Sequence, residues 1–365
     1  MTHDETSPRA RSGRGYAVAL AFACAATACS VALHPAGAPT RPAPTPTTSP
    51  HPVVTPTSVP PPTPSPIARL AHLEVPADTT GDAGSTAAAA APALTSGSVT
   101  FERRGDLFVA PAQIDGRTLG DVLLDTGAGA TFIDQRLADE MQLPEMITAS
   151  TAGSRAEREA SIRELHGLTV GGLALAADRT FVVDLHDADA LVGGPLAGVI
   201  GFPAVGAAPF TLDFTTGTFT VHTDAIFEPP AGAQAEALRI DQGLPFVEAT
   251  LADGTAVWLL LDSASSVALT VWRGFAKQHP GAIAPSTSGA ATEGSVRESE
   301  LCSLRLLGEK YDRIPVTIED APTRPWHRAR VVGRIGMALL RDLRITVHPA
   351  TERIWVERPR PADSR

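Results

Sequence analysis

The sequence is poor in positive charge. Its 365 residues include 30 Lys and Arg against 40 Asp and Glu, which gives a formal net charge of −10 at pH 7. Non-specific nucleic-acid binding normally needs a basic face, so we expect no nucleic-acid partner. Charged residues make up 19% of the chain and hydrophobic residues 43%. This balance excludes a wholly disordered protein and allows a sizeable core.

Cysteine is also scarce, with three in the chain. Cys24 and Cys29 lie in an apolar stretch near the N-terminus, so Cys302 is the only cysteine elsewhere. If Cys29 is lipidated, as considered next, the folded region holds no internal disulfide. The apolar surroundings of Cys302, "SELCSLRLL", predict a small core residue rather than a reactive thiol.

The apolar stretch near the N-terminus is too short for a comfortable membrane span. Residues 1–31 have the pattern of a signal peptide, in which three arginines precede "YAVALAFACAATACSVAL". The "ATAC" at 26–29 is similar to a bacterial lipobox with Ala in place of the usual Leu, and it predicts lipidation at Cys29. A plain signal peptide and an uncleaved anchor are the alternatives. We expect an exported protein of the bacterial cell envelope, either periplasmic or tethered to the membrane through its N-terminus alone.

Residues 32–98 are dominated by Pro, Thr, Ser, Ala and Gly and show no apolar periodicity. This composition predicts a disordered linker, extended where it is richest in proline. The globular region is predicted at 99–358, and residues 359–365 form a C-terminal tail.

The globular region contains an internal duplication. "DGRTLGDVLLDTGAGATFID" at 115–134 matches "DGTAVWLLLDSASSVALTV" at 253–271, each with an apolar strand, an Asp, a small-residue turn and a second apolar strand. Downstream, "LAGVIGFPAV" matches "VVGRIGMALL", and each leads into a predicted hairpin. Matched features in one order predict two copies of about 110 residues. We place them at 99–232, the first lobe, and 233–358, the second lobe.

Both lobes are predicted to be all-β. Short apolar runs such as "LFVAPAQI" and "RIPVTI" alternate with turns rich in Gly, Asp and Pro. Brief helices are expected only in "DQRLADEM", "RGFAKQH" and "MALLRDL".

Each copy carries an acid at the end of its apolar strand, Asp125 in the first lobe and Asp262 in the second. A buried carboxylate without partners is strongly destabilising, so something should share its charge. A pseudo-twofold axis between the copies would bring the two acids together, where they would share one proton. The ionised acid could then deprotonate water while the protonated acid donates to a carbonyl oxygen. Such a pair would hydrolyse an amide with no metal or cofactor.

The turn "LLDTGAGATFI" resembles the active-site turn of pepsin-like and retropepsin-like aspartic proteases, and "GVIG" and "GRIG" resemble the hydrophobic-Gly segments behind it. The whole is similar to bacterial exported aspartyl proteases with two retropepsin-like lobes in one chain. Over 99–358 the resemblance implies a bilobal acid protease fold with Asp125 and Asp262 as the catalytic pair. The supporting turn residues that it implies are Thr126, Gly127, Ala128, Ser263 and Ala264.

The resemblance also assigns roles around the pair. Thr126 and Ser263 would hydrogen-bond across the lobe interface, and Gly127 would offer its amide to the carboxylate. Hairpin flaps would cover a cleft between 99–230 and 240–358, formed by residues 147–165 in the first lobe and 285–301 in the second. The flap residues that we single out are Gly153, Ser154, Gly289 and Gly294. Neither flap contains an aromatic residue, so a pepsin-type flap tyrosine is absent.

Three other functions are open at this point. Ala264 replaces the family glycine in the second turn, which allows a catalytically impaired peptide-binding protein. "DTGAGAT" could be the phosphate-binding hairpin of an actin-like phosphotransferase, although the long amphipathic helices of that fold are not apparent. A metal site is disfavoured because the histidines lack ligand spacing. We expect an aspartic endopeptidase that acts on polypeptides as a monomer.

Overall fold

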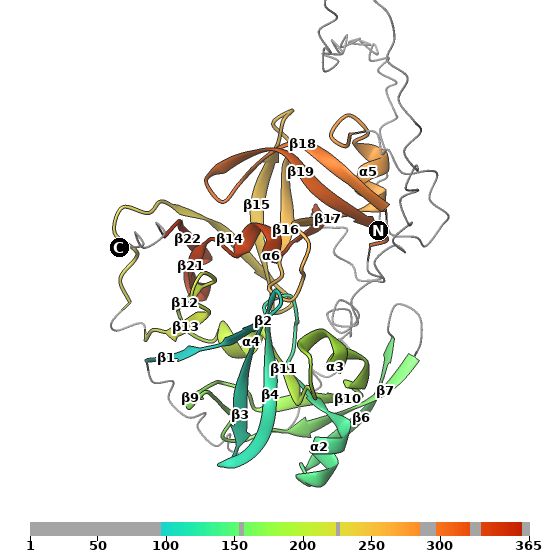
Figure 1. Ribbon diagram of the computed structural model, residues 1–365, viewed down its shortest axis with the longest axis vertical. Coiled ribbons are helices and arrows are strands. Elements are labelled where there is room, and N and C mark those ends of the chain that lie inside the picture. Colours follow the sequence, from blue (N-terminus) through green and yellow to red (C-terminus); the bar gives the residue numbers. More distant parts are fainter. Residues whose placement is uncertain (1–95, 153–156, 224–226, 285–296, 322–329, 360–365) are drawn as a thin grey trace, which may run out of the picture. The chain divides into compact units, whose positions relative to one another are not determined.

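The computed structural model describes the greater part of the predicted globular region (Figure 1). The described residues are 96–152, 157–223, 227–284, 297–321 and 330–359. All of them belong to one compact unit, Val59–Arg365. The predicted signal segment with Cys29, nearly all of the linker, and the predicted flap residues Gly153, Ser154, Gly289 and Gly294 lie outside the described residues. The predicted boundaries of the segments and lobes therefore stay predictions.

The described strands fall into two sheets. The ten-stranded sheet contains β2 (Glu102–Arg104), β3 (Leu107–Ile114), β4 (Arg117–Asp125), β5 (Phe132–Asp134), β6 (Glu145–Ala152), β7 (Glu157–Glu164), β8 (Thr169–Val170), β9 (Leu173–Ala174), β10 (Arg179–Val183) and β11 (Gly198–Gly201). The twelve-stranded sheet contains β1 (Gly97–Thr100), β12 (Phe210–Asp213), β13 (Thr218–Val221), β14 (Ala235–Asp241), β15 (Leu244–Leu251), β16 (Ala256–Leu261), β17 (Leu269–Trp272), β18 (Arg297–Leu306), β19 (Glu309–Glu319), β20 (Val331–Ile335), β21 (Arg344–His348) and β22 (Arg353–Glu357). The predicted all-β class is confirmed.

Helices are short and connect strands. They are α2 (Gln135–Glu140), α3 (His186–Val192), α4 (Phe202–Val205), α5 (Arg273–Gln278), α6 (Met337–Leu340) and the 3-10 turn η4 (Pro349–Thr351). The three helices expected from the sequence correspond to α2, α5 and α6. The helices α3 and α4 were not expected, since each is only about two turns or less and leaves little periodicity to read. No helix in the described parts of the chain is long and apolar enough to cross a membrane.

The two copies repeat one strand arrangement. In the first copy the neighbours run β10, β5, β11, β4 and β3, and in the second they run β19, β17, β20, β16 and β15. The directions also match, because β5 and β17 are parallel to β10 and β19, while β11 and β20 are parallel to β4 and β16. β4 ends at Asp125, and β16 ends just before Asp262. These two strands therefore have equivalent neighbours in the two copies. This equivalence allows residues of the two copies to be compared position by position.

The two downstream hairpins pair with each other across the copies. The hairpin of β12 and β13 and that of β21 and β22 join through β12 and β21, which run antiparallel. β1 adds to the free side of β13, and β14 adds to β22. One sheet thus contains strands from both lobes, and it links them independently of the acid-bearing turns.

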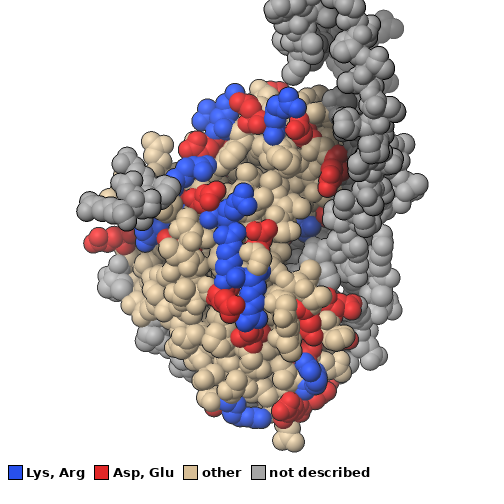
Figure 2. Space-filling model, in the orientation of Figure 1, with Lys and Arg blue, Asp and Glu red and all other residues tan. Residues whose placement is uncertain are grey.

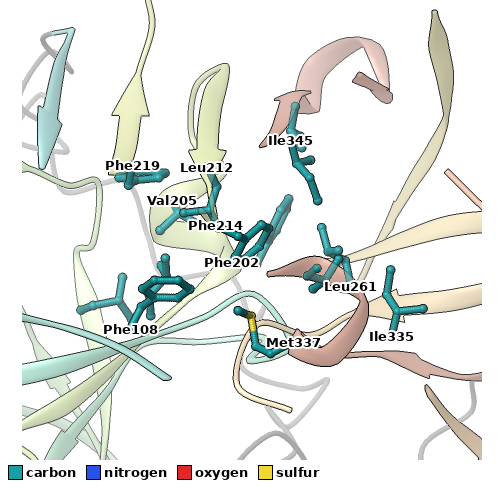
Figure 3. Packing of buried hydrophobic residues seen from close by; sticks show 14 of the residues in the cluster. Phe108, Phe202, Val205, Leu212, Phe214, Phe219, Leu261, Ile335, Met337 and Ile345 are labelled. Carbon is teal, nitrogen blue, oxygen red and sulfur yellow. The ribbon is translucent and has the colours of Figure 1, made fainter. Parts of the chain in front are cut away.

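A continuous apolar core accompanies this pairing. Figure 3 shows first-lobe side chains such as Phe202 and Phe214 beside second-lobe side chains such as Leu261 and Met337. Leu261 immediately precedes Asp262 in the chain, so the residue that leads into the acid is anchored in the shared core. The core holds the end of β16 in place because close-packed interiors resist displacement.

The described surface carries charges of both signs and one free thiol. On the face drawn in Figure 2, acidic and basic side chains are interspersed. Cys302 is exposed, so the prediction of a small core residue was wrong. Its neighbour Leu301 on β18 is buried, and successive strand residues point to opposite faces. The apolar run around Cys302 therefore marked the strand correctly but not the face on which the thiol lies.

Candidate active site

Both acids lie buried at the ends of matched strands. The last residues of β4 are buried because the strand runs between β3 and β11 in the middle of its sheet. Asp125 closes this strand opposite Gly201 and is fully buried. Asp262 follows β16 directly, donates its amide to the Ile335 carbonyl at 3.0 Å, and is 2% exposed. The apolar pattern that predicted a core strand thus leads each carboxylate into the interior.

Each carboxylate is held by an amide of its own turn. The Gly127 amide donates to Asp125 Oδ1 at 2.8 Å, and the Ala264 amide donates to Asp262 Oδ1 at 3.0 Å. Within the described residues, Asp125 Oδ2 is buried and has no hydrogen-bond partner. One oxygen of Asp125 is therefore fixed, and the other can carry a proton.

Thr126 and Ser263 connect the two turns by four hydrogen bonds. The Thr126 amide donates to Ser263 Oγ, and the Ser263 amide donates to Thr126 Oγ1, both at 3.0 Å. Thr126 Oγ1 donates to the Leu261 carbonyl at 2.8 Å, and Ser263 Oγ donates to the Leu124 carbonyl at 3.0 Å. Both side chains are almost fully buried. The network is reciprocal, so each lobe holds the turn of the other.

The third turn position differs between the lobes. A Cβ placed on Gly127 would lie 2.7 Å from Asp262 Cγ, which is closer than side-chain atoms approach, so this glycine allows the first turn to lie against the second acid. Its counterpart Ala264 is buried, and its methyl belongs to an apolar cluster that is otherwise built from first-lobe residues, including Leu123 and Ala128. The Ala264 methyl is therefore accommodated, and its amide still bonds to Asp262.

The glycines of "GVIG" and "GRIG" have a structural role. A Cβ on Gly201 would overlap the Ala130 carbonyl, and one on Gly336 would overlap the Ser265 and Val267 carbonyls. The backbone of each acid-bearing turn therefore packs directly on its glycine. The residue after each glycine donates its amide to the same turn, Phe202 to Ala128 and Met337 to Ser265.

Burial raises the pKa values of both acids. Burial raises the pKa of Asp125 well above its ordinary value, and the charge of Asp262 raises it further, against the lowering effect of the Gly127 amide. Burial also raises the pKa of Asp262, opposed by the Arg334 guanidinium and by the Ala264 amide. The pKa of Asp125 is therefore raised by burial and by the second acid, whereas Asp262 has a cation beside it.

Sequence reasoning missed Arg334, which lies beside Asp262. Its side chain is 4% exposed, and its Nε lies 3.6 Å from Asp262 Oδ2. The signal was the difference between "GVIG" and "GRIG", because an arginine occupies a position that is apolar in the other copy. The described parts of the chain contain no group of three His, Cys, Asp or Glu side chains arranged to hold a metal ion.

The first of the two acid-bearing turns falls within a match to a known protein family. A family model described as Aspartyl protease matches residues 110–204, which include Asp125, its turn and β11. The match covers about a quarter of the chain and ends before Asp262. No curated protein sequence matches the chain.

Among solved structures, the crystal structure of an aspartic proteinase from Irpex lacteus matches with a TM-score of 0.45 and 11% sequence identity. The match covers 74% of this chain and 99% of that chain. Over residues 110–204, the chain is similar to aspartyl proteases.

Proposed function

We propose that the protein is an aspartic endopeptidase in which Asp125 and Asp262 act together on a bound peptide. The observation that carries this proposal is the pair of buried carboxyls on matched turns that are joined by Thr126 and Ser263. A fold has no structural need for two buried acids whose charges repel, because apolar residues would be more favourable there. A shared proton and a hydrolytic role account for both acids.

The chemistry that we propose uses one ionised and one protonated carboxyl. Asp262 accepts a proton from water as the water oxygen bonds to the scissile carbonyl carbon. Asp125 donates its proton to the carbonyl oxygen as that carbon–oxygen double bond becomes single, which gives a neutral tetrahedral diol. When the diol collapses, the carbon–nitrogen bond breaks, Asp262 returns its proton to the leaving nitrogen, and Asp125 recovers one from a diol hydroxyl. The amides of Gly127 and Ala264 hold the two carboxyls in place during both steps.

The alternative of an impaired peptide-binding protein rested on Ala264. The methyl of Ala264 packs into a buried apolar cluster, and its amide makes the same bond as that of Gly127. The second half of the site therefore retains the groups that the mechanism needs. This packing favours the enzyme over the binding protein.

The setting of the enzyme is also a proposal. We propose export to the bacterial cell envelope, lipidation at Cys29, and a polypeptide substrate bound between the lobes under flaps at 147–165 and 285–301. The proline-rich linker would place the lobes away from the membrane.

Cleavage of an unfolded polypeptide by the purified chain tests the function. We expect a bell-shaped pH dependence of kcat/KM, and loss of cleavage by at least about a thousandfold in Asp125→Asn and in Asp262→Asn. Thermal unfolding of each variant would show that the fold is retained. Equal cleavage by the wild type and by either variant would exclude the paired mechanism.

A further inference from the structure

Arg334 joins a buried network of charged and polar groups behind Asp262. Its Nη2 donates to Glu319 Oε2 at 3.0 Å, and its Nε lies 3.4 Å from Thr270 Oγ1 and 3.6 Å from Asp262 Oδ2. The guanidinium also lies 6.0 Å from the centre of the Trp272 ring. Arg334 therefore contacts two carboxylates while it is excluded from water, where its field is screened little.

The first lobe shows that the fold does not require this network. Arg334 pairs with Thr270 in register, and the equivalent pair in the first lobe is Val199 with Phe132. Glu319 on β19 pairs with the residue two positions after Thr270, and Val183 on β10 pairs with the residue two positions after Phe132. Val183 is therefore the counterpart of Glu319.

The three first-lobe counterparts, Val199, Phe132 and Val183, belong to one buried apolar cluster. Buried ion pairs contribute little to stability compared with apolar residues that fill the same space. Among the described residues, the Arg334–Glu319 pair occurs only in the second lobe, so its effect on Asp262 is the feature that needs an explanation.

Four charged groups meet at this point from four elements. They are Asp125 at the end of β4, Asp262 after β16, Glu319 on β19 and Arg334 on β20. Arg334 faces Oδ2 of Asp262, whereas Oδ2 of Asp125 is buried and has no partner among the described residues. The charge of Arg334 lowers the pKa of both acids, but its ion pair is with Asp262, so it favours the ionised state of Asp262 over that of Asp125.

We propose that Arg334 is a positioning residue that keeps Asp262 ionised, as the base, and the single proton on Asp125. This proposal rests on the proposed function for its catalytic meaning, although the protonation it describes can be measured without catalysis. The charge of Arg334 makes the two acids unequal, so each acid has one role in the first step of hydrolysis.

The test compares full-length variants by their pH profiles. Arg334→Val/Glu319→Val replaces both charges by the residues found in the first lobe, so Glu319 is not left as a carboxylate without its partner and only the effect on Asp262 remains. We expect the acidic limb of kcat/KM to move upward by about one to three pH units, because an opposite charge within hydrogen-bonding range lowers the pKa of a carboxyl by about that amount. Arg334→Lys retains the charge and should leave the limb near its wild-type position. Thermal unfolding verifies that each variant folds.

The outcomes separate this proposal from the proposed function. A uniform fall in activity with an unmoved acidic limb would show a merely structural role and overturn the proposal, while the protease assignment stands. An equal shift in Arg334→Lys and in the double variant would also overturn it. If the wild type cleaves no substrate, the proposed function is refuted. The protonation of Asp262 is then tested by a titration of carbon-13-labelled carboxyl groups. An upward shift of Asp262 in the double variant supports the charge-setting role, and no shift overturns it.

Discussion

Removal of the hydroxyl groups between the two turns is a direct test of how the lobes are held in register. Ser263→Ala deletes the acceptor of the Thr126 amide and the donor to the Leu124 carbonyl. Thr126→Val deletes the corresponding bonds to Ser263 and Leu261. The two substitutions keep nearly the same shape, so the loss reports hydrogen bonds rather than a cavity.

The expected cost follows from burial. A net hydrogen bond contributes about 1 kcal/mol, and a buried donor left without a partner costs about 1–3 kcal/mol. Each single substitution removes two bonds and leaves one buried amide without its acceptor, so we expect a loss on the order of 2–4 kcal/mol in the free energy of unfolding. The double variant should lose less than the sum, with a coupling of about 1 kcal/mol, because the bonds form one network.

Chemical denaturation of the two single variants and the double variant measures the coupling, and kcat/KM measures the effect on the site. Thr346→Val is a matched control. It removes a buried cross-lobe hydrogen bond of 2.9 Å to Thr211, in the sheet formed by the two hairpins and away from the acids. It should lower stability by about 1–2 kcal/mol and leave kcat/KM unchanged, whereas Ser263→Ala should lower both.

Two results would refute this reasoning. Additive costs in the double variant would mean that Thr126 and Ser263 act independently. A stability loss below about 0.5 kcal/mol in both single variants would mean that the network does not hold the turns together.

The remaining predictions concern the turns and the pair. Gly127→Ala should reduce kcat/KM strongly and destabilise the fold by about 1–3 kcal/mol, because the new Cβ would lie 2.7 Å from Asp262 Cγ. Ala264→Gly should retain cleavage. Comparable kinetics for the two variants would contradict the close approach of the first turn to Asp262. Gly336→Ala should prevent normal folding, since its Cβ would overlap backbone carbonyls of the second turn, and near-wild-type thermal unfolding would show that this turn can shift. Burial raises the pKa of Asp125, so the wild type loses stability as the pH rises from the ordinary pKa of Asp towards the raised pKa of Asp125. The free energy of unfolding falls by about 1.4 kcal/mol for each pH unit between these two pKa values. Asp125→Asn should remove this loss and be at least as stable as the wild type at pH 7 in urea unfolding, whereas equal pH slopes for the two proteins would contradict a raised pKa.

The sequence predicts some features of this structure and leaves others open. Apolar runs bounded by turn residues identified β4 and β16, since burial on both faces leaves a continuous hydrophobic stretch. The exposure of Cys302 could not be read in the same way, because an apolar run does not state which face of a strand meets the core. Arg334 was visible as a letter in "GRIG", but its partners Thr270 and Glu319 come from other strands and have no fixed spacing from it.

The sequence by itself determined the duplication, the two acids at strand ends and the small residues of their turns, because these are local patterns of hydrophobicity and turn chemistry. Only the tertiary structure decided that Thr126 bonds to Ser263, that the hairpins pair through β12 and β21, and that Arg334 forms an ion pair with Asp262. Such contacts join residues far apart in the chain, and their register depends on how the two copies pack. That packing also joins the turns that carry the two buried carboxyls.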